Sequence, residues 1–252
     1  MRSSVAAALG IGLAICLSGT WASAQTTTTT TTTTTAPYTT TPEYQRDLAE
    51  EQRQVHPPRN AFELNVRGGY SQGFGRWRGG AGGSIPDLAN AGGNVELGAS
   101  YRATPHSSAG VLLQYNQYSG DQSNTTVRGM VAGLDYTYHA RPGERVDPWL
   151  SLGVGYRFLW LVPNNESNTL LHGFQLGRIT AGLDAVVTDD MAFGPYVGAD
   201  LNMFLWQVGP GPDGQIPDNG RLSTFISAGV SGRFDLGGTR DRRLPPIYTS
   251  AR

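Results

Sequence analysis

The chain has 252 residues, of which 34 are glycine and 15% are charged, and its formal net charge at pH 7 is −1. A chain this close to neutral gives no electrostatic reason to expect a nucleic acid as its partner. All 19 basic residues are arginine, and there is a single cysteine.

The N-terminal segment has the pattern of a secretory signal peptide. Arg2 provides the positive charge, residues 5–17 form an apolar stretch, and Ala22-Ser23-Ala24 is a small-residue cleavage site. We therefore predict cleavage after Ala24. The cysteine, Cys16, lies inside this segment and follows a bulky isoleucine, whereas a lipoprotein signal needs a small residue there. No later segment approaches the ~20 uninterrupted apolar residues of a membrane-spanning helix.

Residues 25–60 are predicted to be a disordered, threonine-rich tether in the periplasm. They begin with ten threonines at positions 26–35, followed by Pro37, Pro42 and a run of charged residues. A segment of this composition cannot bury a core. A short solvated helix over residues 43–55 is the alternative, although no apolar stripe runs through it.

From residue 62 onward, apolar side chains alternate with small or polar ones, which is the period of a β-strand. In the segment 149–160, every second residue from Leu150 to Trp160 is apolar, while the positions from Ser151 to Arg157 hold serine, glycine and arginine. The eight predicted strands span residues 62–71, 93–102, 108–118, 127–139, 149–160, 174–187, 191–206 and 222–236. Membrane-crossing strands need about 9–11 residues when tilted, and these lengths suit them.

The predicted connections between strands alternate in length. Short turns cover residues 103–107, 141–147 and 188–190, and longer loops cover residues 72–92, 119–126, 161–173 and 207–221. Long loops on one rim and short turns on the other are typical of outer-membrane barrels. With both termini in the periplasm, the long loops would face the outside of the cell.

The pattern from Phe62 to Leu236 resembles the eight-stranded bacterial outer-membrane β-barrels, including the barrel domain of outer-membrane protein A. In that class the final strand ends in an assembly signal, which Ser231, Phe234 and Leu236 match in part. The resemblance implies an all-β, eight-stranded, antiparallel, up-and-down transmembrane β-barrel over residues 61–236. Residues 237–252 form a short basic tail, which is too short for the peptidoglycan-binding domain of larger relatives.

Charged residues fall on the face predicted to line the barrel interior. They are Glu63, Arg67, Glu96, Arg102, Asp135, Arg157, Arg178, Asp184, Asp200, Arg233 and Asp235. Eight strands enclose an interior just wide enough for side chains to fill, so six acids against five bases predict a charge-balanced, ion-paired plug. A path for ions or protons is the alternative interpretation. A wide diffusion pore is excluded because it needs about sixteen strands.

Aromatic residues on the opposite face fall near the strand ends. They are Tyr70, Tyr101, Tyr136, Tyr138, Phe158, Trp160, Phe193 and Phe234. We interpret them as interfacial girdles at the two surfaces of a membrane. The alternative is a soluble periplasmic barrel with its apolar face turned inward around a ligand.

Catalytic patterns are weak, and we predict that the chain is not an enzyme. The one plausible cluster is His172 with Glu166 and Ser167 in the preceding loop, since hydrolysis needs a base within reach of a nucleophile. Metal-ligand spacings and cofactor motifs are missing. The sequence therefore predicts a structural or surface-interaction role in the bacterial outer membrane, as a monomer with membrane lipid as its partner. A narrow channel or transporter of small apolar molecules, and a lipid-modifying enzyme, are the alternatives; an extracellular ligand or peptidoglycan partner is left open.

Overall fold

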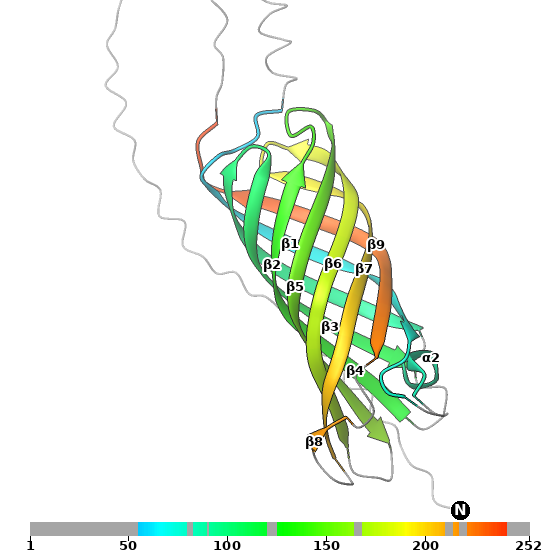
Figure 1. Ribbon diagram of the computed structural model, residues 1–252. Coiled ribbons are helices and arrows are strands. Elements are labelled where there is room, and N and C mark those ends of the chain that lie inside the picture. The colour runs from blue at the N-terminus through cyan, green and yellow to red at the C-terminus, as the bar shows by residue number, and fades with distance from the viewer. Residues whose placement is uncertain are drawn as a thin grey trace, which may run out of the picture. The chain divides into compact units, whose positions relative to one another are not determined.

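The computed structural model describes residues 55–79, 83–89, 91–119, 125–163, 168–209, 214–216 and 221–240, which form a β-barrel (Figure 1). Its wall consists of β1 (Ala61–Gly75), β2 (Ala91–Thr104), β3 (Ser107–Ser119), β4 (Thr125–His139), β5 (Val146–Pro163), β6 (Thr169–Thr188), β7 (Met191–Val208) and β9 (Leu222–Leu236). The short strand β8 (Gly214–Gln215) pairs with the end of β7, and the helix α2 (Ile85–Leu88) lies between β1 and β2. No helix in these described ranges is long and apolar enough to cross a membrane.

The sheet closes on itself. Each long strand pairs antiparallel with its neighbours in the chain, and the pairing of β1 with β9 joins the two ends of the sheet. Closure leaves no unpaired strand edge in the wall, so the backbone N–H and C=O groups bond to neighbouring strands all the way round. The predicted all-β, eight-stranded, antiparallel, up-and-down fold is confirmed. We call the end with the β2–β3, β4–β5 and β6–β7 connections the turn rim, and the opposite end the loop rim.

Several strands are longer than the sequence pattern predicts. β5 runs to Pro163 and β6 starts at Thr169, so most of the predicted loop 161–173 is strand. At the turn rim, β5 begins at Val146, which moves Asp147 from the predicted turn into the wall. At the loop-rim end of β5 the alternation weakens because the inward positions become apolar, as at Leu159 and Leu161, so a pattern-based boundary stops too early.

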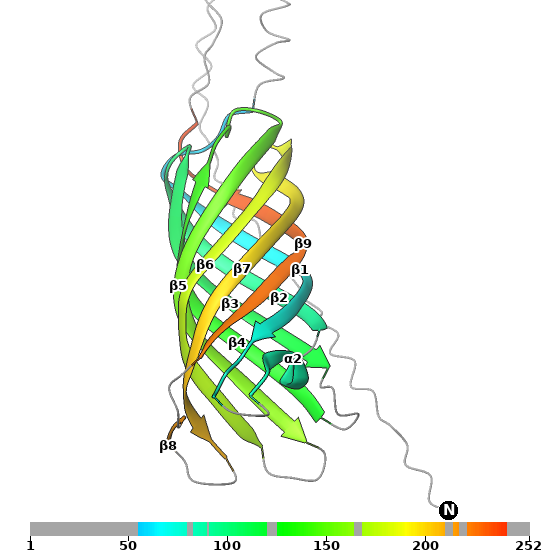
Figure 2. The ribbon, with the colours of Figure 1, turned by 45° about the vertical axis from the view of Figure 1, so that its right-hand side comes forward.

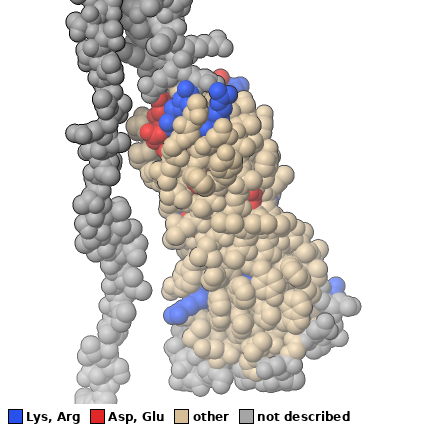
Figure 3. Space-filling view, turned by 90° about the vertical axis from the view of Figure 1, so that its left-hand side faces the viewer, with Lys and Arg blue, Asp and Glu red and all other residues tan. Residues whose placement is uncertain are grey.

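The two faces of the wall have opposite polarity. Outward side chains are apolar and exposed, as shown by Leu134, Val197 and Val230, which are each at least 60% exposed. Inward positions hold buried charged residues, including Arg102 and Glu63, which are 1% exposed or less. Figure 3 shows the consequence on one side of the barrel, where charged side chains gather at the two ends and a largely uncharged band separates them. The alternative barrel with its apolar face inward is therefore wrong.

Irregularities in β5, β6 and β7 change which residues face outward. Between His172 and Gly173 the partner on β7 changes from Trp206 to Phe204, so that Leu205 is an extra residue. Phe204 is fully buried inside the barrel, whereas Trp206 stacks on the outward His172 with ring centroids 5.5 Å apart. Simple alternation places both residues on one face, and the bulge separates them.

The segments before and after the barrel meet at the turn rim. Arg59 and Thr239 exchange two backbone hydrogen bonds of 3.0 and 2.8 Å. Gly237 and Gly238 have φ angles of 72° and 82°, a region that favours glycine, and they turn the chain back after β9. The Arg240 side chain then donates to the carbonyl of His56 and pairs with Asp190 in the β6–β7 turn. Residues 237–240, which follow the final strand, are thus hydrogen-bonded to the segment before β1 and to the β6–β7 turn.

Candidate functional site

The inner half of the lumen, towards the turn rim, is filled by ion pairs between side chains of adjacent or next-but-one strands. Arg102 Nη2 lies 2.8 Å from Glu63 Oε2, and Arg233 Nη1 lies 2.6 Å from Asp184 Oδ2. Asp235 lies between the two arginines, at 3.7 Å from Arg102 and 3.5 Å from Arg233. All five residues are at most 6% exposed. Buried charges are tolerated when they are paired in this way.

A second set of ion pairs crosses the lumen at mid-height. Arg67 lies 2.6 Å from Glu96, whose other carboxylate oxygen accepts a hydrogen bond from Arg178. Arg157 lies 2.6 Å from Asp200, and Arg178 is 3.6 Å from the same carboxylate. The chain Arg67–Glu96–Arg178–Asp200–Arg157 connects β1, β2, β5, β6 and β7 across the barrel. These five side chains fill the lumen at this height, and each of them has more than one contact partner.

The structure adds His139 and Asp147, which the sequence pattern missed, to this interior. His139 Nδ1 lies 2.7 Å from Asp147 Oδ2, and Arg102 Nη2 lies 2.7 Å from His139 Nε2. Since a guanidinium can only donate, Nε2 accepts from Arg102 and we assign a ring proton to Nδ1, facing the carboxylate; the approach of Arg233 Nη1 to Nδ1 is then a close contact and not a hydrogen bond. The predicted strand 127–139 ends at His139 and Asp147 falls in the predicted turn 141–147, so neither residue was expected among the lumen charges.

The group His139, Asp147 and Asp184 offers three ligand atoms within 4.8 Å of one another, the kind of set that binds a metal. The Arg233 guanidinium already lies 2.6 Å from Asp184 and 3.5 Å from Asp147, with Nη1 3.1 Å from His139 Nδ1. A positive charge is therefore supplied by the protein itself. We interpret this group as an ion-pair cluster and assign no metal to it.

Asp135 differs from the other predicted lumen charges. Ten of the eleven are buried, and Asp135 is half-buried. Its carboxylate accepts a hydrogen bond of 3.4 Å from Ser151, and among the described residues no ion pair within 4.0 Å reaches it. With Asp147 added to the six predicted acids, the lumen holds seven carboxylates against five arginines. The predicted count of six acids and five bases therefore omits one buried acid and the buried His139.

The outer half of the lumen, towards the loop rim, is filled by apolar residues, a feature that the sequence analysis did not predict. This apolar plug consists of Trp77, Ile85, Ala89, Tyr118, Val127, Leu159, Leu171, Phe204, Ile216 and Phe225. Ile85 and Ala89 come from α2 and the residue after it, and Figure 2 shows α2 beside this end of the barrel. Burying large apolar side chains stabilises the fold by about 1.5–3 kcal/mol each. The described parts of the connection between β1 and β2 thus contribute Trp77, Ile85 and Ala89 to this apolar plug.

Polar atoms without protein partners lie where the plug meets the ion pairs. The Arg157 guanidinium carbon lies 4.1 Å from the centroid of the Phe225 ring. Arg157 Nη1, Asn116 Nδ2 and both amide atoms of Gln175 are buried and bond to no described residue. Buried polar groups of this kind are ordinarily satisfied by ordered water. At this layer the described side chains leave these hydrogen-bonding groups unmet.

The predicted girdle residues lie on the outward face. Tyr70, Tyr101, Tyr136, Tyr138 and Phe193 are exposed, and Phe158, Trp160 and Phe234 are half-buried against their neighbours. Phe62 adds to the turn-rim group by packing edge-on against Tyr101, with ring centroids 5.8 Å apart. Tyrosine and phenylalanine predominate near the turn rim, and the two outward tryptophans lie near the loop rim.

At the loop rim, six rings pack into an aromatic cluster formed by Tyr156, Phe158, Trp160, His172, Phe174 and Trp206. The hydroxyl of Tyr156 lies 2.6 Å from His172 Nδ1, so the imidazole is hydrogen-bonded on the outward surface. The proposed catalytic cluster is not assembled around this ring by described residues; Glu166 and Ser167 lie outside the described ranges.

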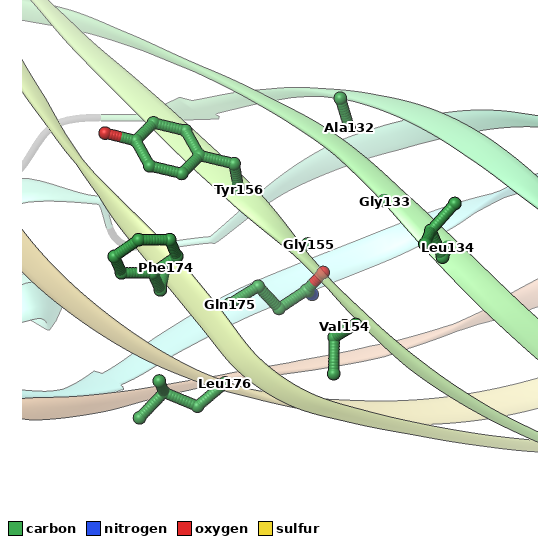
Figure 4. Close-up of a pocket in the computed structure, with 9 residues that line it drawn as sticks. All are labelled: Ala132, Gly133, Leu134, Val154, Gly155, Tyr156, Phe174, Gln175 and Leu176. Carbon is green, nitrogen blue, oxygen red and sulfur yellow. The ribbon is translucent and has the colours of Figure 1, made fainter.

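An open groove of about 620 Å³ runs along the outward face below this cluster (Figure 4). Ala132, Leu134, Val154, Tyr156, Phe174 and Leu176 contribute its side-chain walls, and Gly133 and Gly155 contribute backbone. In Figure 4 the Gln175 side chain extends from β6 to Gly155. A Cβ atom at position 155 would lie 2.9 Å from Gln175 Oε1 and 2.7 Å from the carbonyl of Ala132. Glycine is therefore required here by close packing.

Comparisons with known proteins support the fold alone. No family model matches the sequence, and no curated protein does. Among solved structures, the chain is similar to Neisserial surface protein A, with a TM-score of 0.48 and 14% identity over 69% of this chain and 96% of that chain. It is similar to the outer membrane protein OprG from Pseudomonas aeruginosa, with a TM-score of 0.43 and 13% identity over 71% and 99%. It is also similar to Ail, the attachment invasion locus protein of Yersinia pestis, with a TM-score of 0.40 and 11% identity over 70% and 99%. The TM-scores of these three structures are below 0.5, and the assignment of the barrel fold rests on the strand pairing of this chain.

Proposed function

We propose that this protein is an integral β-barrel of the bacterial outer membrane with a closed lumen, and that it holds its loop-rim segments at the cell surface for interaction. The observation that carries the proposal is the reversal of polarity between the two faces. Thirty-one large apolar side chains are exposed on the described residues, while arginines and carboxylates are buried inside. An apolar surface of this extent drives association in water and is matched by lipid.

The dimensions of the apolar band fit a membrane. On the β4–β5 pair, Tyr138 lies opposite Leu150 near the turn rim, and Arg128 lies opposite Trp160 near the loop rim. Ten residues of strand at about 3.3 Å each, tilted by about 40°, rise about 25 Å, which is the height of the apolar band in outer-membrane barrels. The aromatic girdles lie at the two edges of that band.

A lumen filled along its length supports a non-conducting role. A permeant ion would have to displace the mid-height ion pairs, in which Arg178 contacts both Glu96 and Asp200. It would then have to cross the apolar plug, where side chains such as Leu159 and Phe204 are fully buried. Removing a charge from its partner in a low-dielectric interior is costly. We therefore favour an anchoring and surface-interaction role over transport.

The half-buried Asp135 supports a narrow channel as a second candidate. Its carboxylate, which has no ion pair within 4.0 Å among the described residues, lies beside Gly133 and Gly153. Both glycines are also half-buried, so water has some access to this part of the lumen. Conduction would require the segment that carries Trp77 and Ile85 to leave the mouth. A lipid-modifying enzyme remains a weaker alternative, because His172 bonds to Tyr156 and no nucleophile among the described residues approaches it.

Membrane insertion is tested by refolding the purified chain into phospholipid vesicles. We expect the protein to float with the vesicles and to migrate differently on electrophoresis before and after boiling, because a closed barrel resists detergent until heated. Recovery of a folded, soluble protein without detergent or lipid would reject the proposal. Native mass spectrometry of the detergent-solubilised protein tests the predicted monomer.

A further inference from the structure

We infer that the outward face of β4, β5 and β6 binds an anionic membrane lipid, with the phosphate headgroup at Arg128 and an acyl chain in the groove beside Ala132. This inference rests on the proposed membrane location. It joins three features that lie in one column on the barrel surface: an arginine, the aromatic cluster and the apolar groove.

The strand registers place these features in successive rows. In the lowest row Ala132 pairs with Tyr156, which pairs with Phe174 on β6. One step towards the loop rim, Met130 pairs with Phe158, which pairs with His172. In the next row Arg128 pairs with Trp160. A molecule extended along the column would therefore meet the groove, then aromatic rings, then a guanidinium.

The groove exists because a small residue occupies an outward position among large ones. Ala132 is exposed between Met130 and Leu134 on β4, and Tyr156 rises beside it. Gly133 and Gly155, the inward residues at this height, bring the backbones of β4 and β5 close together beneath it. A long apolar chain can lie against this floor, because Ala132, Leu134, Val154, Phe174 and Leu176 give the groove mainly apolar walls.

The wall of the groove is held in one arrangement. The Tyr156 ring packs edge-on against Phe174 at 5.4 Å between centroids, and its hydroxyl bonds to His172 Nδ1 at 2.6 Å. Trp206 stacks on the opposite side of His172, at 5.5 Å. Rings fixed before binding lose little conformational entropy when a ligand arrives, which favours a defined site over transient contact with lipid.

Arg128 determines the headgroup that this site would select. It is exposed on the outward face of β4, at the edge of the estimated 25 Å band, where lipid headgroups lie. An arginine fork suits a phosphate, and a basic residue near a membrane surface attracts anionic lipid. The column therefore has charge complementarity at one end and apolar complementarity at the other.

A second groove on the barrel provides an internal comparison. It has a volume of about 370 Å³ and is lined by outward residues of β1, β2 and β3, including Leu97, Ala99 and Val111. Two rows towards the loop rim, at the height where the first groove reaches Arg128, the second groove reaches Tyr70, Gly93 and Gln117, which are uncharged. We expect this groove to accept acyl chains without selecting the headgroup.

The test uses tryptophan quenching by lipids with brominated acyl chains. The protein without its predicted signal peptide, and so without Trp21, is folded into phosphatidylcholine vesicles that contain a minor fraction of brominated phosphatidylglycerol or brominated phosphatidylcholine. Trp160 and Trp206 lie in the aromatic cluster, whereas Trp77 and Trp149 are buried inside the barrel, so the change in fluorescence reports on the proposed site. The wild-type protein is expected to be quenched more strongly by the anionic lipid.

Two pairs of variants decide the result. Arg128→Gln is expected to lower the preference for phosphatidylglycerol about five-fold, which is the effect of one basic residue near a membrane surface. Arg221 is also exposed at the loop rim, and Arg221→Gln is expected to leave the preference unchanged. Ala132→Phe fills the groove and is expected to abolish the preference, while Ala99→Phe in the second groove preserves it. The heat-dependent shift in migration verifies that every variant is folded.

Equal quenching by both lipids in the folded wild-type protein would overturn the inference. So would an unchanged preference in Arg128→Gln or in Ala132→Phe. These results differ from a failure of the proposed function, in which the wild-type protein would not enter the vesicles at all.

Discussion

The two halves of the lumen close the same barrel by opposite chemistry. Towards the turn rim, Arg102, Arg233 and their carboxylate partners fill the space with ion pairs. Towards the loop rim, apolar side chains such as Leu159 and Phe204 fill it as they would the core of a soluble protein. Ion pairs depend on every partner being present, whereas apolar packing depends on shape. Substitutions in the two halves should therefore lower the free energy of unfolding for different reasons: loss of an ion-pair partner in one half and loss of packing in the other.

The largest effect is expected from Arg233→Met in the ion-pair half. Arg233 lies within 3.5 Å of Asp184, Asp147 and Asp235, and its removal leaves these buried carboxylates without that partner. We expect a loss of about 3–5 kcal/mol in the free energy of unfolding, measured by urea titration of the protein in vesicles.

The matched control for Arg233→Met is Arg141→Met. Arg141 pairs with Glu144 at 3.4 Å on the surface, where both side chains are at least 60% exposed. Its loss should cost no more than about 1 kcal/mol. If the two variants lose equal stability, the buried ion pairs do not hold the inner half together.

In the apolar half, Leu159→Ala is expected to lower the free energy of unfolding by about 2–5 kcal/mol, because Leu159 is 0% exposed and its truncation leaves an enclosed cavity. The same titration is applied to Leu152→Ala, an outward residue on the same strand that is 52% exposed. No enclosed cavity forms there, and the loss should be markedly smaller. A larger loss from Leu152→Ala would mean that the plug contributes little.

Gln175→Met tests the boundary between the halves. Both amide atoms of Gln175 are buried without a protein partner, so an apolar side chain of similar length should stabilise the barrel by about 1 kcal/mol. Gln114→Met is the comparison, since Gln114 donates to Asn116 and accepts from Arg178, and its loss should be destabilising by about 1–2 kcal/mol. Destabilisation by Gln175→Met instead would point to ordered water bound to the amide.

The smallest effect is expected outside the lumen, from Tyr156→Phe. This change removes the hydroxyl that bonds to His172 and keeps the ring that packs on Phe158 and Phe174. A half-exposed hydrogen bond contributes about 1 kcal/mol or less to the free energy of unfolding. Tyr156→Ala, which also removes the ring, should lower the free energy of unfolding further than Tyr156→Phe. Equal losses in the two variants would mean that the hydrogen bond accounts for the whole effect and that the ring packing contributes nothing.

The fold could be predicted from the sequence because a membrane barrel imposes a period of two on every strand. In the segment 149–160 this period assigns Leu150, Leu152 and Val154 to the outside, where the structure finds them 40–53% exposed. It assigns Ser151 and Arg157 to the inside, where both are buried. Alternation is local, so one sequence is enough to detect it.

What the sequence could not show depends on contacts between distant segments or on breaks in the period. Trp206 faces outward because of the extra residue Leu205, which no alternating pattern reveals. His139 and Asp147 are only eight residues apart, yet their shared place among Arg102 and Arg233 follows from closure of the barrel. The sequence pattern does not predict the apolar plug, because inward apolar residues such as Val127 fall at the ends of the predicted strands. Alternation alone cannot distinguish a buried lumen residue from a strand terminus there.

The most direct test of a closed lumen is the conductance of the folded wild-type protein in a planar bilayer. The ion pairs and the apolar plug predict a silent bilayer at moderate voltage, with the heat-dependent shift in migration confirming that the inserted protein is folded. Stable, reproducible conductance steps from that same folded protein would show that the lumen is open and would contradict the proposed role.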